Sequence, residues 1–383
     1  MLVSGEASGD AHAAKLVKAL REISPKTEIE FFGATGAKMR EAGVETILNA
    51  DDLAIVGLPE IARALPMFWN AFQKLKKIAV ERKPDAVILV DFPDFNLKLA
   101  KSLKKAGLKI IYYISPQLWA WRKHRKKTIE KYVDLLLTIL PFEKNWYAEQ
   151  GISHIEYVGN PLAGEVKANL GKEEFCSKHN LDSKKPIIAL LPGSRHKEIV
   201  RILPLMLETA SIMTEKKPEI QFLIALLSER RSADAKTVIE QAKKKNLKLP
   251  ETLLAIWGET RDVLNAADAA AVTSGTATLE TAIIGTPMTI VYKTSAFNYA
   301  TLRPLIRVPH FGLINLIAQE RLAKELIQGD FTKEKLSREL FQLLEPANNQ
   351  QMREKLKKVV ETLGKGASER AAKAILQYLQ NKG

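Results

Sequence analysis

Short apolar runs alternate with longer helical stretches along this chain, and this alternation constrains the fold more than any other feature. Residues 86–90, 110–114 and 135–139 are almost continuous runs of Val, Ile, Leu and Tyr, and residues 155–158 follow. Runs that are apolar on both faces are typical of parallel strands covered by helices on both sides. The first part of the chain therefore predicts a doubly wound parallel sheet.

The same rhythm restarts after a polar, charged stretch at residues 167–185. Further apolar runs predict the strands of a second parallel sheet at residues 187–191, 222–225, 269–272 and 288–292. Because 383 residues exceed what one core usually holds, we expect two domains. The predicted class is α/β: two Rossmann-like domains at residues 1–168 and 185–345 that face each other across a cleft. We expect the helices of residues 346–383 to pack back against the N-terminal domain.

The first predicted strand is unusually short. Only Leu2 and Val3 precede the first turn. A buried strand usually has about four to six residues. We therefore expect the start of this sequence to be truncated or misassigned.

Composition restricts the classes of partner. The hydrophobic fraction of 46% is ordinary for a globular protein, whereas the net charge of +14 favours a polyanionic partner such as a phosphorylated substrate or an anionic lipid. A solvated, Lys-rich surface is the alternative. No RNA- or DNA-binding motif appears, so nucleic acid is not expected. With one cysteine, no signal peptide and no apolar run of about 18 residues, we expect a cytoplasmic protein.

Two strand-to-helix turns of the second half have the residues of anion-binding sites. The first carries Gly193, Ser194 and Arg195 after a predicted strand. Exposed backbone N–H groups and a helix N-terminus favour a phosphate there, and Arg195 can add a bidentate contact. A tight turn with a solvated arginine is the alternative.

The second turn carries Ser274, Gly275 and Thr276, followed by Glu280. Small residues let a ligand approach the backbone, and the hydroxyls can donate to phosphate. Glu280 can accept hydrogen bonds from ribose hydroxyls. A helix capped by Ser274 or Thr276 is the alternative. Two such turns in one predicted domain indicate a site for a nucleotide diphosphate.

The first turn of the chain, residues 4–10, lacks the spacing of a dinucleotide-binding loop. Glu6 and Asp10 add negative charge that would repel a pyrophosphate. We therefore predict that Ser8 and Asp10 contact a sugar hydroxyl or the acceptor.

Asp91, Asp94 and Asn96 directly follow a predicted strand. The carboxyl ends of parallel strands form the edge of a sheet that faces ligands. A partly buried carboxylate there can remove a proton from a hydroxyl, so Asp91 and Asp94 are both candidate general bases. An Asx turn around Pro93, with Asp94 or Asn96 capping the next helix, is the alternative.

Trp119 and Trp121 lie beside Arg122 after the next predicted strand. Tryptophan rings can stack on sugars and arginine can bind phosphate, so Trp119 and Arg122 are candidate acceptor ligands. The same tryptophans could instead form a wedge in the core.

Bulky apolar residues gather near lysines at Met67, Phe68, Trp69 and Phe72. A basic amphipathic element of this kind is typical of a helix that lies in a membrane interface or lines an acyl-chain groove. A buried core stripe is the alternative.

No metal site is indicated. The six histidines do not pair at the spacing of metal ligands, and no Asp-x-Asp motif appears. We therefore expect no cofactor or metal beyond the substrates.

In this order, these segments resemble the lipid-A-disaccharide synthases, a family of inverting glycosyltransferases with the GT-B fold. The resemblance spans nearly the whole chain and is carried by the segments SGEASGD, VGLPE (residues 56–60), DFPDFN, SPQLWAWR, LPFEK, VGNPL, LPGSR, SGTATLE, YK at Tyr292–Lys293, the region of Asn315, and KELIQ. Ile314 and Lys324 depart from the prolines that family members often carry near Asn315.

The resemblance implies transfer of 2,3-diacylglucosamine from UDP to the 6-hydroxyl of 2,3-diacylglucosamine 1-phosphate, with a β-1,6 linkage. It implies that Asp91 is the base, that Arg195 contacts the diphosphate, and that Asn315 belongs to the site. By analogy, Glu280 would hold the ribose and Ser274 to Thr276 the phosphates. It also implies peripheral contact with the cytoplasmic face of the inner membrane; the oligomeric state stays open.

Two alternatives remain at this point. Another GT-B enzyme, such as a UDP-sugar 2-epimerase, would share the nucleotide-binding turns but would need no acyl-lipid surface. A basic protein without catalytic activity could bind anionic lipid or RNA, and it would not recognise UDP.

Overall fold

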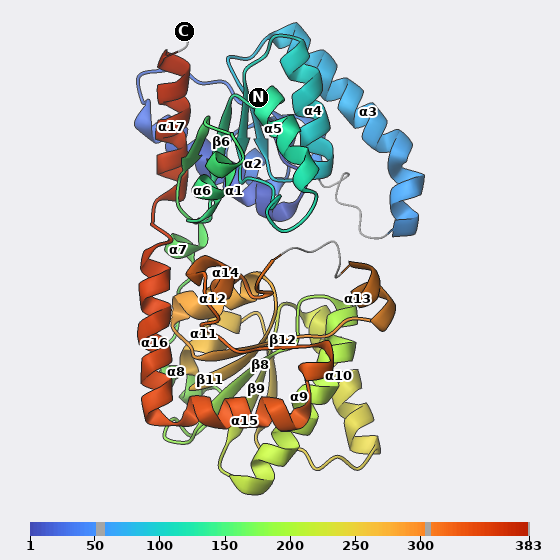
Figure 1. The fold of residues 1–383 in the computed structure, drawn as a ribbon, viewed down its shortest axis with the longest axis vertical. Helices are drawn as coiled ribbons and strands as arrows, with labels where there is room; N and C mark the ends of the chain where they lie inside the picture. The colour runs from blue at the N-terminus through green and yellow to red at the C-terminus, as the bar shows by residue number, and fades with distance from the viewer. Residues whose placement is uncertain (51–57, 303–307, 382–383) are drawn as a thin grey trace. The chain divides into compact units, whose positions relative to one another are not determined.

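The computed structural model describes residues 1–50, 58–302 and 308–381. The chain forms two compact units (Figure 1). We call Met1–Pro161 together with Leu363–Gly383 the first unit, and Leu162–Thr362 the second unit. Val56 and Gly57 of the VGLPE segment lie outside the described residues.

The described part of the first unit contains a seven-stranded parallel sheet with the order β3-β2-β1-β4-β5-β6-β7. Its strands are β1 (Leu2–Val3), β2 (Phe32–Thr35), β3 (Glu45–Asn49), β4 (Val87–Val90), β5 (Ile110–Tyr113), β6 (Leu135–Thr138) and β7 (Ile155–Tyr157). The chain first runs outward from β1 to β3 and then restarts on the other side of β1 with β4. The strand order therefore reverses between β1 and β4.

Alternate residues of these strands point to opposite faces and build two cores. Leu2 and Ile88 pack with α1 and α17, whereas Val3 and Leu89 pack with α3 and α4. Both faces are apolar because both are covered by helices. The helices of this unit are α1 (Ala7–Ile23), α2 (Ala37–Glu41), α3 (Leu58–Arg82), α4 (Pro93–Lys105), α5 (Lys126–Tyr132), α6 (Glu143–Glu149) and α17 (Ala367–Asn381), with the 3-10 turn η2 (Lys123–Arg125).

The described part of the second unit repeats this order in a six-stranded parallel sheet, β10-β9-β8-β11-β12-β13. Its strands are β8 (Ile187–Leu191), β9 (Gln221–Leu226), β10 (Leu253–Trp257), β11 (Ala269–Thr273), β12 (Met288–Tyr292) and β13 (Glu325–Ile327). Here the order reverses between β8 and β11. The sequence prediction of an α/β fold with two doubly wound sheets is confirmed.

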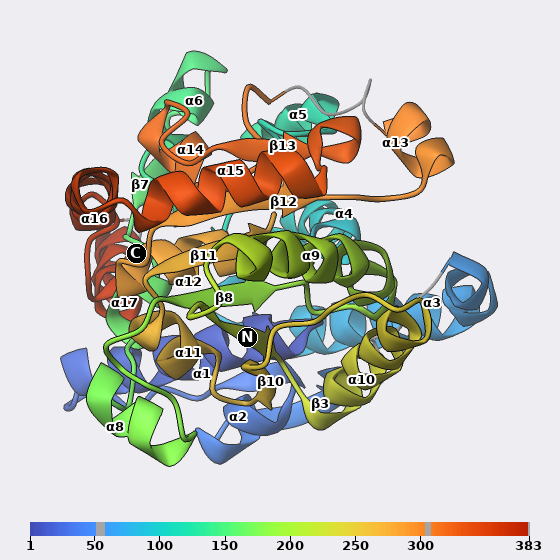
Figure 2. The ribbon, with the colours of Figure 1, turned by 90° about the horizontal axis from the view of Figure 1, so that it is seen from below.

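Helices cover this second sheet on both faces. On one face α9, α10 and α15 share a core with Ile188 and Phe222 (Figure 2). The helices of the unit are α7 (Leu162–Glu165), α8 (Lys172–Lys178), α9 (His196–Lys216), α10 (Glu229–Lys244), α11 (Thr260–Ala266), α12 (Thr276–Ile284), α13 (Ala296–Leu302), α14 (Leu313–Ala318), α15 (Lys333–Leu344) and α16 (Pro346–Glu361), with η4 (Gln328–Asp330). Among the described residues, no helix has the length and apolar character needed to cross a membrane.

The boundaries of the units differ from the expected 1–168, 185–345 and 346–383. The stretch expected as a linker belongs to the second unit, because the backbone N–H groups of Asn169 and Leu170 donate to Asp262 Oδ1 at 2.6 and 3.0 Å. Helix α16 also belongs there and contacts α12 and α14. Only the segment from Leu363 onward belongs to the first unit, where α17 packs on α1.

Four strands were not predicted: β2, β3, β10 and β13. Strand β2 contains Gly33, β3 and β10 lie at the sheet edges with partly exposed residues, and β13 has three residues. Strands β2, β3 and β13 lack the continuous apolar pattern of the strands at the centre of each sheet, whereas β10 is an apolar run that the sequence prediction did not include.

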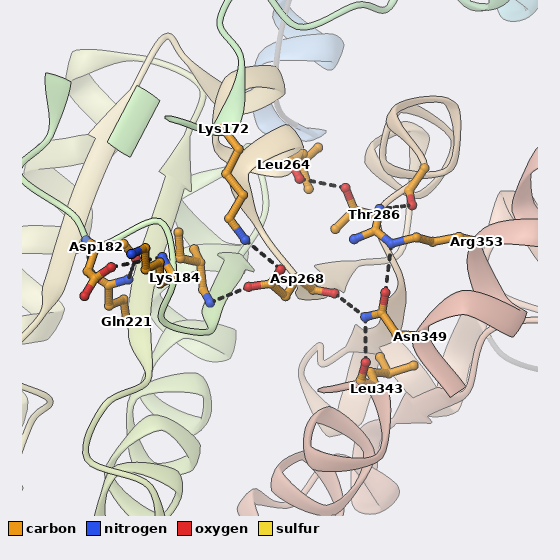
Figure 3. A network of polar contacts seen from close by, with 12 residues as sticks. Lys172, Asp182, Lys184, Gln221, Leu264, Asp268, Thr286, Leu343, Asn349 and Arg353 are labelled. Atoms are coloured by element: carbon orange, nitrogen blue, oxygen red, sulfur yellow. Dashed lines mark hydrogen bonds and ion pairs between the residues drawn. The ribbon is translucent and has the colours of Figure 1, made fainter. Parts of the chain in front are cut away.

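A polar network around Asp268 ties the second unit together (Figure 3). Its carboxylate accepts hydrogen bonds from Lys172 Nζ of α8 at 2.7 Å and from the backbone N–H of Ile187 at 2.9 Å. Asn349 Nδ2 of α16 donates to the backbone oxygens of Asp268 at 2.8 Å and Leu343 at 2.7 Å. The network therefore joins α8, β8, β11, α15 and α16.

We predict that Asn349→Ala lowers the free energy of unfolding by about 2 kcal/mol, because two partly buried carbonyls lose their donor. Urea denaturation of the full chain measures this change. The matched control is Asn348→Ala, which removes an exposed amide and should change the free energy by less than about 0.5 kcal/mol. Equal effects of the two substitutions would contradict the prediction.

Candidate active site

A cavity of about 620 Å³ opens at the carboxyl ends of the strands of the second unit. Its walls come from the loops after β8, β9, β10 and β11, so it lies where the strand order reverses. In doubly wound sheets this is the place where ligands bind. All seven residues predicted to bind UDP line it: Gly193, Ser194, Arg195, Ser274, Gly275, Thr276 and Glu280.

The backbone N–H groups of the turn at Gly193 bind the carboxylate of Glu198, a residue of the following helix. Glu198 Oε2 accepts hydrogen bonds from the backbone N–H groups of Ser194 at 3.0 Å and Arg195 at 3.1 Å. A Cβ at Gly193 would lie 2.5 Å from this oxygen, and the residue has a φ of 113°, so only glycine fits. The donors predicted for phosphate are therefore occupied by Glu198. The Arg195 side chain is 83% exposed, and its NH1 lies 3.5 Å from Glu198 Oε1.

The second turn presents an open helix N-terminus to the cavity. Gly275, with a φ of 148°, is the N-cap of α12, and no side chain caps this end. The alternative of a cap by Ser274 or Thr276 is therefore excluded; the Ser274 hydroxyl donates to Phe311 O at 2.7 Å. The first N–H groups of α12 lack partners within the helix, which favours an anion at this point.

Glu280 lies in the same cavity beside a residue that the sequence analysis did not identify. Arg261 Nε lies 3.7 Å from Glu280 Oε2, and Arg261 NH1 donates to Glu165 O at 3.0 Å. The Glu280 side chain is 26% exposed, and both Glu280 and Arg261 line the cavity. Arg261 could not be found from a motif, because it lies in none of the segments that indicated a ligand site in the sequence.

In the first unit, Asp91 lies at the corresponding reversal point, directly after β4. Asp91 and Phe92 both have left-handed backbone conformations, with φ of 48° and 50°. Such conformations cost free energy for residues other than glycine and are common at active sites. Tyr112 Oη and Asn96 Nδ2 donate to the Asp91 backbone oxygen at 2.6 and 2.8 Å and hold this turn. Gly5 makes room for it, since a Cβ there would lie 2.3 Å from the Phe92 ring.

The two candidate bases have opposite electrostatic environments. Burial, followed by the nearby charge of Glu6, raises the pKa of Asp91 to about 6. For Asp94, partial burial is outweighed by Arg125 and Arg122, whose hydrogen bonds and charges lower the pKa of its carboxyl. A carboxylate with a raised pKa is the stronger base near neutral pH. Asp91 is therefore the better candidate for the base, and the role of Asp94 as a base stays a prediction.

Three predicted sugar or acceptor ligands have structural roles instead. Asp10 is 4% exposed, and its carboxylate accepts from the backbone N–H groups that begin α2. Asn96 is fully buried beneath the Asp91 turn. Asn315 is fully buried and bridges to Ala323 and Glu325. All three side chains are buried and bonded within their own units, and their contact with a sugar or acceptor stays a prediction. Ser8 is exposed in the first turn of α1.

The tryptophans after β5 differ from each other. Trp119 Nε1 donates to Glu143 Oε1 at 3.0 Å, and its ring packs on Phe142, so Trp119 is partly a core residue. Burial raises the pKa of Glu143 to about 7, against hydrogen bonds from Trp119 and from backbone donors. Trp121 is 45% exposed, and the Arg122 guanidinium lies 4.1 Å from its ring centroid.

The predicted membrane element is part of α3. Met67, Phe68 and Phe72 are partly buried against the core, while Trp69 is 62% exposed. Phe68 lies 6.4 Å from the ring centroid of Phe92, so the rings of α3 continue into the Asp91 turn. Met67, Phe68 and Phe72 therefore belong to the core side of this apolar stripe, and Trp69 faces outward.

We predict that Asp91→Asn stabilises the protein at pH 7 by about 2 to 3 kcal/mol. The folded-state pKa of Asp91, about 6, exceeds the ordinary value of 3.8, so ionisation destabilises the native state as pH rises through this interval. The neutral amide removes this penalty, and asparagine tolerates left-handed backbone. Denaturation at pH 4 and pH 7 measures the effect.

The gain from Asp91→Asn should shrink towards pH 4. The control, Asp94→Asn, should give no gain at pH 7, because it removes a carboxylate that pairs with Arg122 and Arg125. A variant Asp91→Asn no more stable than the wild type at pH 7 would contradict the assignment.

Comparison with known proteins agrees with this geometry. A family model described as lipid-A-disaccharide synthetase matches residues 1–379. The lipid-A-disaccharide synthase of Trichlorobacter lovleyi is 41% identical over 371 residues, which cover 97% of this chain and 94% of that protein. The enzyme of the same name from Syntrophus aciditrophicus is 42% identical, with 99% of this chain and 97% of that protein covered.

Solved structures share the fold at low identity. A putative UDP-N-acetylglucosamine 2-epimerase from Listeria monocytogenes has a TM-score of 0.66 at 14% identity and covers 100% of this chain and 96% of its own. A sucrose-phosphate synthase from Thermosynechococcus elongatus has a TM-score of 0.59 at 14% identity, with 100% and 99% covered. These likenesses show the fold alone, which is GT-B. By the match along its whole length, this chain belongs to the lipid-A-disaccharide synthase family of glycosyltransferases.

Proposed function

We propose that this chain transfers 2,3-diacylglucosamine from UDP to the 6-hydroxyl of 2,3-diacylglucosamine 1-phosphate, giving the β-1,6 disaccharide and UDP. Family membership provides the reaction. The observation that carries the mechanism is the buried Asp91 carboxylate, with a pKa of about 6, on a strained turn at the carboxyl edge of the first sheet. A base in this range is largely ionised at neutral pH and still accepts a proton effectively.

The second unit binds the UDP part of the donor in this proposal. Arg195 and the open N-terminus of α12 contact the diphosphate, and Glu280 accepts hydrogen bonds from the ribose. Support comes from the cavity that these groups line together and from the pairing of Arg261 with Glu280. Glu198 has a structural role: its carboxylate occupies the backbone N–H groups of the Gly193 turn. A phosphate can therefore contact this turn only through the Arg195 side chain.

The reaction is a single displacement with inversion. Asp91 removes the proton of the 6-hydroxyl as the oxygen attacks the anomeric carbon of the donor. The bond from that carbon to the UDP oxygen breaks, and the electron pair leaves with UDP. Arg195 and the helix dipole of α12 stabilise the added negative charge. Asp91 then gives its proton to solvent, which returns the carboxylate to its starting state, and the charge on UDP is balanced by Arg195 and α12 without a metal in this proposal.

We also propose that the protein works at the cytoplasmic face of the inner membrane, held there by α3. Leu65 and Trp69 are 61% and 62% exposed on this helix, near the lysines of its second half. An exposed Trp beside basic residues is suited to an interface of anionic lipid. Figure 1 shows α3 as the long helix drawn in blue.

Asp91→Asn should lower kcat by about two to four orders of magnitude while the KM for the donor stays within about threefold. Disaccharide formation is measured with EDTA present, because the mechanism needs no metal. The wild-type kcat/KM should rise with pH with a midpoint near the Asp91 pKa of about 6. Asp94→Asn serves as the comparison and should retain a larger share of kcat. Near-normal turnover by Asp91→Asn would refute the assignment of the base.

Replacing both Leu65 and Trp69 by Ser should reduce the fraction of protein that sediments with vesicles of anionic phospholipid by about tenfold. Val80→Ser is the matched control, since Val80 is an exposed apolar residue of the same helix, 41% exposed. It should change sedimentation little. Unchanged binding by the double variant would contradict the role of α3.

A further inference from the structure

Two arginines converge on one carboxylate beside the proposed catalytic turn. Arg122 NH1 donates to Asp94 Oδ1 at 2.5 Å, and Arg125 NH2 donates to the same oxygen. Asp94 begins α4 after β4, whereas both arginines follow β5, the neighbouring strand. The cluster therefore lies at the same edge of the sheet as Asp91.

The charge of this cluster exceeds what its own ion pairs balance. One carboxylate faces two guanidinium groups, which leaves one net positive charge. Arg125 is 20% exposed and Arg122 is 36% exposed, so both are partly withdrawn from water, while Asp94 is 64% exposed. An exposed carboxylate of this kind contributes little to stability. Two half-buried arginines around it are better explained by an anionic ligand than by stability.

The cluster also lies within electrostatic reach of the catalytic turn. The Tyr112 hydroxyl donates to the Asp91 backbone oxygen at 2.6 Å. Asp94, which holds both guanidinium groups, lies three residues after Asp91 in the same turn into α4. An anion bound by the arginines would therefore lie close to a substrate hydroxyl at Asp91.

We propose that Arg122 and Arg125 form the subsite for the phosphomonoester of the acceptor, with Asp94 as the positioning residue that holds the two guanidiniums together. This inference rests on the proposed function. The acceptor carries its phosphate and its reacting hydroxyl on one sugar ring, so a phosphate site must lie within one sugar of the base. The exposed Trp121 ring, under Arg122, offers a surface against which that sugar can stack. Arginine pairs bind phosphate oxygens through fixed, bidentate geometry.

The test compares two acceptors, 2,3-diacylglucosamine 1-phosphate and the same lipid without phosphate. Arg125→Gln should lower kcat/KM for the phosphorylated acceptor about 10- to 100-fold, and for the other acceptor less than about twofold. The KM for the UDP-sugar should not change. Arg125→Lys keeps the charge and should recover part of the loss. Lys127→Gln, which removes the same charge from an exposed position of α5, should leave both acceptors unaffected.

An equal loss with both acceptors would show that Arg125 acts on the fold and not on the phosphate, and would overturn the subsite. A wild-type enzyme that does not distinguish the two acceptors would overturn it as well. Absence of transfer by the wild type would contradict the proposed function instead. In that case NMR titration with glucosamine 1-phosphate and with glucosamine still decides the subsite: only the phosphorylated sugar should bind, and Arg125→Gln should abolish its binding.

Discussion

The reversal of strand order in each parallel sheet is the constraint that positions the proposed base and the proposed diphosphate contacts. In the first unit it lies between β1 and β4, and in the second between β8 and β11. At such a point the two connections leave in opposite directions, so no loop covers the edge between the strands. Asp91 follows β4, and Gly193 and Ser274 follow β8 and β11. The apolar strands that make both sheets thus also decide where polar residues can meet a ligand.

Much of this architecture could be predicted from the sequence, because central strands covered on both faces require continuous apolar runs. Strands β4, β5, β8 and β11 could therefore be predicted from their apolar runs, and so could the turns that follow them. The edge strand β3 could not, since its half-exposed residues have no such pattern, and the apolar run of the edge strand β10 was not predicted either. The unit boundary was also missed: it depends on the hydrogen bonds of Asp262 to Asn169 and Leu170, which lie 93 and 92 residues away in the chain.

The roles of polar residues were the least predictable part of the site. Asp91 and Asp94 lie three residues apart and look equivalent in the sequence, yet one is buried and the other is paired with two arginines. Asp10 and Asn315 look like ligands, but each satisfies backbone groups inside its unit. A side chain becomes catalytic or structural through its burial and its partners. Both are properties of tertiary structure that residue type and spacing do not contain.

The fold alone does not distinguish this chain from epimerases, since an epimerase and a sucrose-phosphate synthase share it. In the proposed mechanism, a sugar leaves UDP only when an acceptor hydroxyl is activated at Asp91. The most direct measurement is UDP release from UDP-2,3-diacylglucosamine with and without 2,3-diacylglucosamine 1-phosphate, followed by identification of the product. The account predicts release that requires the acceptor and yields the disaccharide. Release at the same rate without acceptor would contradict it and would indicate an epimerase or hydrolase.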